Sequence, residues 1–460
     1  MATALIALAG CQTAPPDIAV PIPTGYRAEA GGPSRPVEPR WVDLFGSPEL
    51  GRLVAGARRE NLDIEAAIAR IDAAEAQAVV ARSALFPTLG GSGDAARNQR
   101  AGSIRSNAFA LGLSASYELD LFGRNRYAAR AADDLARATR FDRDTIALST
   151  AAAVANTYFA VLSSQDRLRI AEDNLRLAGR VLDAVRGRLG VGTGTALDLA
   201  QQESVVAGQR ARIPPLVQAV QQNRNVLAVL LGRTPESVSV RGGSLDALRV
   251  PRVRPGLPSE LLLRRPDIAA AEATLAANEA NVASARAAFF PSIQLTGSGG
   301  FQSAVFGSLL GSGALVYGIG AGLAQPIFDG FALQGRLALE QGRTAEAAAN
   351  YRRTIIQSLA DVENALVAIR QTAEFETRQR EAVTASRRAL DITETRLREG
   401  TIDVVTLFTT QTTLFGAQDA LAQVRLLRFQ AALSLIQALG GGWTPERAAP
   451  VARVAEARAP

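Results

Sequence analysis

The sequence is an internal duplication. Residues 285–291 read Ala-Arg-Ala-Ala-Phe-Phe-Pro and repeat residues 81–87, Ala-Arg-Ser-Ala-Leu-Phe-Pro, 204 residues further along the chain. Gly400-Thr401 repeats Gly192-Thr193 at a spacing of 208 residues. Each copy has the same order: a helix, two short alternating segments, a long helical stretch without proline, a Gly/Thr turn and a second long helix. The chain must therefore build one structural unit twice.

Composition excludes several classes of protein. The 460 residues include no His and one Cys, so catalytic and metal sites that need imidazole or thiolate ligands cannot form. The net charge of +6 comes from scattered Arg side chains, without a basic stripe for nucleic acid. We expect no enzymatic activity, no metal or other cofactor, and no nucleic-acid partner. No run of about 18 apolar residues is present, which predicts that any membrane crossing is made by strands.

The N-terminus resembles the end of a lipoprotein signal. An apolar run closes on Leu-Ala-Gly and is followed by Cys11, although the usual positive segment is missing, which leaves open whether the true start lies upstream. We expect Cys11 to be acylated after cleavage, and Gln12 after it agrees with sorting to the outer membrane. The alternative is an unmodified Cys in a frayed terminus.

The predicted organisation has six parts. They are a signal remnant (1–11), a Pro-rich tether (12–45), a first repeat (46–240), a linker (241–258), a second repeat (259–442) and a mobile tail (443–460). The first repeat holds strands at about 88–120, a long helix at about 124–189 and a return helix at about 196–231. The second holds strands at about 292–325, a long helix at about 331–399 and a return helix at about 404–439.

The long helices carry a heptad pattern. One apolar residue recurs every seven positions in both copies: Leu168, Leu175, Leu182 and Leu189 in the first, and Val383, Leu390 and Leu397 in the second. This spacing predicts coiled-coil packing, because an isolated helix of roughly 100 Å is not stable by itself. Pro214-Pro215 predict a break with a kink in the first return helix, whereas the second has no such interruption.

The alternating segments decide whether the chain enters a membrane. In Phe109–Leu119 and Leu315–Leu323 every second residue is apolar and most of the intervening residues are small or polar. This alternation fits transmembrane strands, and it also fits a half-buried soluble sheet. Four strands cannot close a barrel, and open sheet edges are not tolerated in lipid, so a barrel needs several chains. We predict a mainly α protein in which three chains form a 12-stranded β-barrel that continues into a helical coiled-coil barrel.

The sequence resembles a known family of transport proteins. It resembles the outer membrane factor (TolC-like) family, in its lipoprotein branch. Three features carry the resemblance: residues 257–268, which include Leu-Leu-Arg-Arg-Pro-Asp-Ile, the paired Phe-Pro motifs, and the Gly-Thr turns. The resemblance runs from about Trp41 to Trp443. It implies a passive outer-membrane exit duct with a large periplasmic portion. The implied partners are two more copies of the chain, a periplasmic adaptor, an inner-membrane pump of the RND type and outer-membrane lipid.

The two Gly/Thr turns are the predicted adaptor contacts, because they are the only short turns at the far ends of the long helices. The residues expected to make this contact are Gly190, Val191, Gly192, Thr193, Gly194 and Thr195 in the first turn, and Glu399, Gly400, Thr401 and Ile402 in the second.

A charged gate does not carry over from the family. Thr406 and Thr409 stand where the resemblance places acidic side chains, and Ile402 stands where some members have Arg. Asp198 and Asp403, just inside the turns, can replace the acidic ring, because three symmetry copies would repel one another. The alternative is that both carboxylates stabilise first helical turns.

Two other functions stay open. The chain can be the exit duct of an ABC-type protein or metal exporter, or, in a different class, a lipid-anchored coiled-coil scaffold. The sequence does not identify the cargo, the adaptor or the pump.

Overall fold

The computed structural model describes residues 18–27, 37–99 and 106–444, which form two compact units. Of these described residues, one unit contains those within 68–141 and 269–354, and the other contains those within 20–67, 142–268 and 355–444. Cys11 and residues 445–460 of the predicted tail lie outside the described residues.

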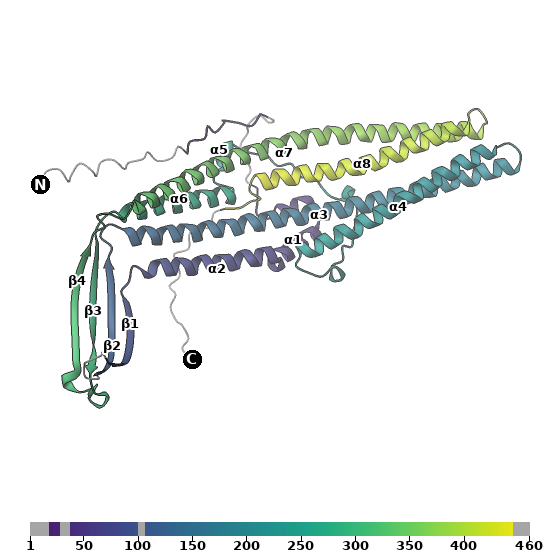
Figure 1. Cartoon of the computed structure of the whole chain (residues 1–460). Helices are drawn as coiled ribbons and strands as arrows, with labels where there is room; N and C mark the ends of the chain where they lie inside the picture. Colours follow the sequence, from purple (N-terminus) through teal and green to yellow (C-terminus); the bar gives the residue numbers. More distant parts are fainter. Residues whose placement is uncertain (1–17, 28–36, 100–105, 445–460) are drawn as a thin grey trace. The chain divides into compact units, whose positions relative to one another are not determined.

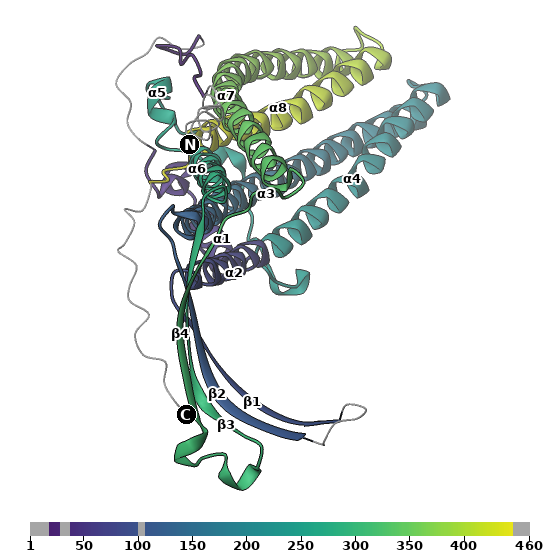
Figure 2. The same cartoon turned by 60° about the vertical axis from the view of Figure 1, so that its left-hand side comes forward.

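The first unit contains a four-stranded antiparallel sheet. Its strands are β1 (Thr88–Asn98), β2 (Ser106–Leu119), β3 (Ser292–Ser303) and β4 (Leu315–Ala324), and they lie side by side in that order (Figures 1 and 2). β1 and β2 come from the first repeat, while β3 and β4 come from the second. The central pairing, β2 with β3, therefore joins the two repeats.

The sheet has two chemically different faces. The register keeps odd-numbered residues opposite odd-numbered ones in all three pairings, so each parity lines one face. The odd face is mostly apolar and includes Leu113, Tyr117 and Ile319, of which Ile319 is 92% exposed. The even face is mostly small or polar and includes Ser114, Thr296 and Ser298. An apolar face without a covering layer distinguishes this sheet from a half-buried soluble one.

Helices complete the first unit. Most of α2 (Leu62–Ser83) and α6 (Pro266–Ala287) belong to it, together with the first parts of α3 (Arg124–Gly190) and α7 (Ala332–Arg398). Arg82 of α2 forms an ion pair with Asp133 of α3 at 2.6 Å. Val282 of α6 packs with Leu337 of α7. The same pairing of a short helix with a long one thus occurs in both repeats.

The second unit is helical. It contains α1 (Pro48–Glu60), α4 (Ala196–Leu230), α5 (Pro258–Leu261) and α8 (Val404–Ala438), the later parts of α3 and α7, and the 3₁₀ turns η2 (Trp41–Phe45), η3 (Pro235–Ser237) and η4 (Leu245–Ala247). Two further 3₁₀ turns, η5 (Phe306–Ser308) and η6 (Ser312–Ala314), connect β3 to β4 in the first unit. The main core of the second unit gathers Phe45, Phe159 and Phe429, with ring centroids 5.0 to 6.1 Å apart.

Each long helix folds back on its return helix, α3 with α4 and α7 with α8 (Figure 1). The predicted heptad residues lie in the packing: Leu182 and Leu390 are buried, and Leu175, Val383 and Leu397 are half-buried against apolar clusters. One of these clusters joins Val181 and Val185 of α3 to Leu390 of α7 and Leu407 of α8. The two hairpins of the second unit therefore share apolar core.

Three expectations need correction. α4 continues through Pro214-Pro215 as one helix, and the carbonyls of Arg210 and Ala211 that lose their donors belong to exposed residues, where water can satisfy them. Trp41 and Phe45, which were assigned to the tether, are completely buried in the core, because their rings fill it.

The exclusion of a membrane-crossing helix was also too strict. α3 contains an 18-residue window of mean hydropathy 1.5, half of it buried, so by length and composition this helix could cross a membrane. The same helix contributes Val154, Phe159 and Leu162 to the core, which explains its apolar composition.

The return helices end at two equivalent glycines. Gly232 follows α4 and Gly440 follows α8, with φ angles of +66° and +85°. A Cβ on Gly232 would lie 2.0 Å from the carbonyl oxygen of Glu60, and one on Gly440 would lie 1.9 Å from that of Arg264. Only glycine fits at these two close approaches.

Gly440→Ala should therefore lower stability strongly, by roughly 3 kcal/mol, because it combines a left-handed backbone with a clash against a backbone oxygen. Gly416→Ala is the matched control, since Gly416 lies within α8 with open space around it and should gain about 1 kcal/mol. Thermal unfolding of the two variants measures the difference. Equal unfolding temperatures would contradict the close packing at Gly440.

Candidate functional site

The first turn, between α3 and α4, is held by backbone hydrogen bonds. The amides of Thr193 and Gly194 both donate to the carbonyl of Arg188, at 2.9 and 3.1 Å, and Gly192 has a φ of +77°. The Thr193 hydroxyl donates to the same carbonyl at 3.2 Å. This is a glycine-terminated helix end in which a threonine satisfies a carbonyl that the helix leaves free.

The second turn, between α7 and α8, repeats this geometry 208 residues later. The amide and the hydroxyl of Thr401 donate to the carbonyl of Arg396 at 3.0 and 3.1 Å, and Gly400 has a φ of +73°. The two turns also belong to one packed region, since Arg188 donates a hydrogen bond to the carbonyl of Leu397 at 3.3 Å. The side chains presented differ, because Val191 is 77% exposed in the first turn whereas Ile402 is half-buried in the second.

Asp198 and Asp403 both cap helices. Asp198 forms a capping box with Thr195, in which each side chain accepts the other residue's backbone N–H, at 2.9 and 3.1 Å. Asp403 is the N-cap of α8 and accepts from the amide of Thr406 at 2.9 Å and from its hydroxyl at 2.6 Å. These two bonds from Thr406 hold the pKa of Asp403 below its usual value.

Thr409, the remaining gate candidate, is exposed one turn further along α8, and its hydroxyl donates to the carbonyl of Val405. The structure thus brings Asp403 and Thr406 into contact and places Asp198 at the start of a different helix. Asp198, Asp403 and Thr406 each have a structural role at a helix terminus, whatever further role they have in a channel.

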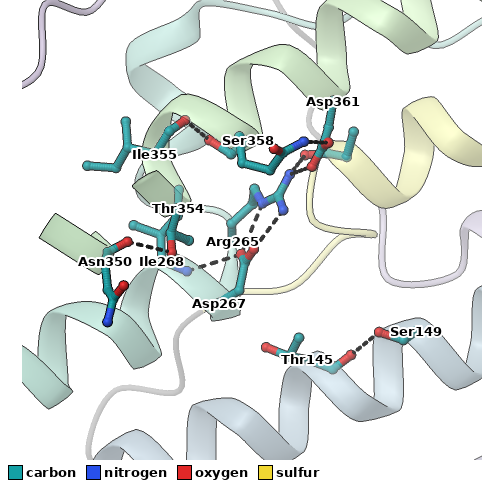
Figure 3. Close-up of polar contacts among 12 residues, drawn as sticks. Thr145, Ser149, Arg265, Asp267, Ile268, Asn350, Thr354, Ile355, Ser358 and Asp361 are labelled. Atoms are coloured by element: carbon teal, nitrogen blue, oxygen red, sulfur yellow. Dashed lines mark hydrogen bonds and ion pairs between the residues drawn. The ribbon is translucent and has the colours of Figure 1, made fainter. Parts of the chain in front are cut away.

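The Arg-Arg-Pro-Asp-Ile motif forms an ionic contact at the start of α6 (Figure 3). Arg265 donates to both carboxylate oxygens of Asp267, at 2.6 and 3.0 Å, and one of its nitrogens reaches Asp361 of α7 at 3.1 Å. The same nitrogen donates to the carbonyl of Ala438, the last residue of α8, at 3.3 Å. The motif was interpreted as a helix cap, and it additionally ties three helices together through one guanidinium.

A second charged cluster was missed by the sequence analysis. Glu376 of α7 is buried, and it pairs with Arg380 at 2.5 Å, with Arg425 at 3.6 Å and with Arg428. Burial raises the pKa of Glu376, but the hydrogen bonds from Arg428 and Arg380 outweigh it and leave the pKa below its usual value. The signal was present, since Glu376 follows Leu168 by 208 residues and replaces a heptad leucine.

An open groove runs beside this cluster. It has a volume of about 820 Å³ and is lined by Arg380, Arg388 and Arg428, with Glu381 and the threonines at 377 and 384. No group of three or more His, Cys, Asp or Glu residues that could hold a metal ion occurs in residues 18–27, 37–99 and 106–444.

The described part of the chain thus contains two long helical hairpins in one unit and a two-faced four-stranded sheet in the other. Residues 53–233 and 257–441 match the family described as "Outer membrane efflux protein", and the chain belongs to this family. It is an efflux channel protein of the outer membrane, and not an enzyme, as predicted.

The chain is similar to several characterised proteins. It is 38% identical to the pyoverdine export outer membrane protein OpmQ of Pseudomonas aeruginosa, over 96% of both chains. It is 32% identical to the toluene efflux pump outer membrane protein TtgC of Pseudomonas putida, over 96% of this chain and 95% of the relative. The open state of the MtrE outer membrane channel of Neisseria gonorrhoeae superposes with a TM-score of 0.86 at 30% identity, over 94% of this chain and 97% of MtrE.

The Glu376 cluster yields a pH-dependent prediction. Glu376→Gln should lower stability at neutral pH by about 2 kcal/mol, because the arginines lose the carboxylate that pairs them. Because the pKa of Glu376 is lower in the folded than in the unfolded state, its carboxylate stabilises the fold at pH values above the usual Glu pKa. This stabilisation is lost as the pH falls through the pKa of Glu376 in the folded state. Unfolding curves of parent and variant should therefore converge on acidification. Glu381→Gln, whose carboxylate is exposed, is the control; a constant gap at every pH would contradict the prediction.

Asp403 allows capping and charge to be separated. Asp403→Asn keeps the acceptor for the Thr406 amide and removes the charge, whereas Asp403→Ala removes both. If the residue acts only as a cap, Asn should leave amide exchange in the first turn of α8 and channel conductance unchanged, and Ala should speed exchange severalfold. If conductance changes equally in both variants, the negative charge itself acts in the channel.

Proposed function

We propose that three copies of this chain form a passive exit duct of a tripartite efflux pump. The duct has a 12-stranded barrel in the outer membrane and a periplasmic barrel of helical hairpins. It docks on a periplasmic adaptor that is joined to an inner-membrane pump of the RND type. The pump supplies the energy, and this chain supplies the exit for small molecules and drugs.

The observation that carries the proposal is the sheet with two faces and two open edges. Its apolar odd face is uncovered, and Tyr317 and Ile319 are 84% and 92% exposed. Every residue of β1 and of β4 is exposed, and each of these strands has a neighbour on one side. A membrane satisfies the apolar face, and further copies of the chain satisfy the edges. Three copies supply 12 strands, which is more than the roughly eight that a small closed barrel needs.

The two Gly/Thr turns, called the tips below, and Cys11 extend the proposal. We assign adaptor contact to the turns at 190–195 and 399–402, because the backbone geometry repeats in both and exposes side chains such as Val191. We assign lipidation to Cys11, which fixes the N-terminus to the membrane. Asp198 and Asp403 remain the candidates for the periplasmic gate, with Thr406 and Thr409 beside them. The similarity to OpmQ makes a pyoverdine-type compound one cargo to test.

The native mass and the conductance of the detergent-extracted protein test the proposal together. We expect a trimer that opens water-filled channels in a planar bilayer, because only closure of the sheet removes the unpaired edges in lipid. The mass of the processed N-terminus, read from the same preparation, should show acyl groups on Cys11. A Cys11→Ser variant should lack the acyl mass and still form channels.

A water-soluble monomer without conductance would overturn the duct and favour the scaffold. A trimer with conductance and unmodified Cys11 would overturn the lipid anchor alone. Co-purification with the adaptor is the separate test of the tips, with Val191→Asp at the first turn and Val229→Asp, exposed near the opposite end of α4, as its control.

A further inference from the structure

The internal repeat specifies how neighbouring copies of the chain meet. In the first repeat, β1 pairs with β2 so that Thr88 lies opposite Ser116. In the second, β3 pairs with β4 so that Ser292 lies opposite Ala324. Residues of β3 therefore correspond to residues of β1 found 204 positions earlier, and residues of β4 correspond to residues of β2 found 208 positions earlier.

The difference of four residues has a structural origin. Residues 99–105 connect β1 to β2, and residues 304–314 connect β3 to β4, which makes the second connection four residues longer. The extra residues lie between the strands and leave the pairing within them unchanged. The two hairpins are therefore equivalent residue by residue, and the equivalence agrees with the spacing of 204 at Phe86 and Phe290 and of 208 at Gly192 and Gly400.

The pairing of β2 with β3 is the only one that joins two repeats within the described strands, and it serves as the template. It places Ser116 opposite Thr296 and Leu113 opposite Gly299. The equivalent of Ser116 in the second repeat is Ala324, and the equivalent of Thr296 in the first is Ser92. In the same way, Leu113 corresponds to Ala321, and Gly299 corresponds to Ala95.

We propose that β4 of one copy pairs antiparallel with β1 of the next copy in this same register. Ala324 then lies opposite Ser92 of the next copy, Ala321 lies opposite Ala95, and Gly318 lies opposite Asn98. This pairing between copies, called the seam below, rests on the proposed function, because it requires that further copies of the chain pair with the edge strands β1 and β4. It specifies which residues of the two copies meet.

The two faces of the sheet support this register independently. It sets odd residues opposite odd ones across the seam, so Leu323 and Ala321 continue the apolar face with Gly93 and Ala95 of the next copy. A slip by one residue would turn Ser92 and Asp94 toward the apolar side, where unpaired polar groups are unfavourable. A slip by two residues keeps the faces, and the pairing of β2 with β3, taken as the template, favours the register without the slip.

The end of β4 also fits a subunit edge. Pro326 lies two residues beyond the last residue of β4, and a proline cannot donate a hydrogen bond to a neighbouring strand. Its counterpart 208 residues earlier is Glu118, within the fully paired β2. The seam therefore ends near Ala324, whereas the template pairing within the chain continues to Leu119 and Ile293.

Disulfide cross-linking in membranes tests the register. Ala95→Cys with Ala321→Cys places two thiols directly opposite across the seam on the odd face, and Ser92→Cys with Ala324→Cys does so on the even face. The controls move one partner by two positions on the same face, using Ala95→Cys with Ile319→Cys or with Leu323→Cys. Opposite Cβ atoms lie about 5 Å apart and displaced ones about 7 to 8 Å, so the opposite pairs should oxidise at least about fivefold faster.

Each outcome decides between the registers. Linked dimers and trimers on a non-reducing gel for at least one opposite pair, with the displaced pairs and the parent chain unlinked, support the proposal. Faster linkage in a displaced pair overturns the register. A native trimer with normal conductance in which no pair links overturns the seam and leaves the duct intact. A monomer without conductance contradicts the proposed function itself.

Discussion

The unpaired backbone groups along β1 and β4 are the constraint on which the rest of this protein depends. A four-stranded sheet with an exposed apolar face can enter lipid, but its two edges present N–H and C=O groups that lipid cannot satisfy. Each edge needs a partner strand, and the partner available to every copy is the opposite edge of another copy. One sheet therefore has two requirements: lipid to cover its apolar face, and partner strands to satisfy its edges within that lipid.

The helices follow the same duplicated plan, with local differences. Both hairpins turn at a glycine of positive φ, and in both a threonine donates to the carbonyl of an arginine four residues before that glycine. Both return helices end at a glycine that packs against a backbone carbonyl. The heptad positions of the long helices differ, because Leu168 in the first hairpin corresponds to Glu376, with its arginine partners, in the second. The apolar position contributes packing alone, while the ionic one links α7 to α8 through charge-assisted bonds, which depend on pH.

The sequence predicted the fold class through patterns that repeat. The heptads gave the long hairpins, the alternation gave the two-faced strands, and the family resemblance was correct. Contacts between segments far apart in the sequence were not predictable. Arg265 was interpreted as part of a helix cap, and nothing in its neighbourhood indicates that it reaches Asp361 and the carbonyl of Ala438. The first return helix was predicted with nearly its observed bounds, but a break was expected at Pro214-Pro215, because local propensity weighs against proline, while the exposure of the freed carbonyls depends on the folded chain. Glu376 stood in the heptad and was overlooked.

The position of the four-residue difference between the repeats explains why the duplication has kept one architecture. Strand side chains alternate with a period of two, so one inserted residue within β3 or β4 would exchange the lipid-facing and water-facing sets over the rest of that strand. The extra residues instead lie in 304–314, between the strands, where added length does not alter the pairing. The repeats can thus differ in length and still supply the same pair of edges. A ring of copies closes only if the edge pairing between chains is as regular as the pairing of β2 with β3 within one chain.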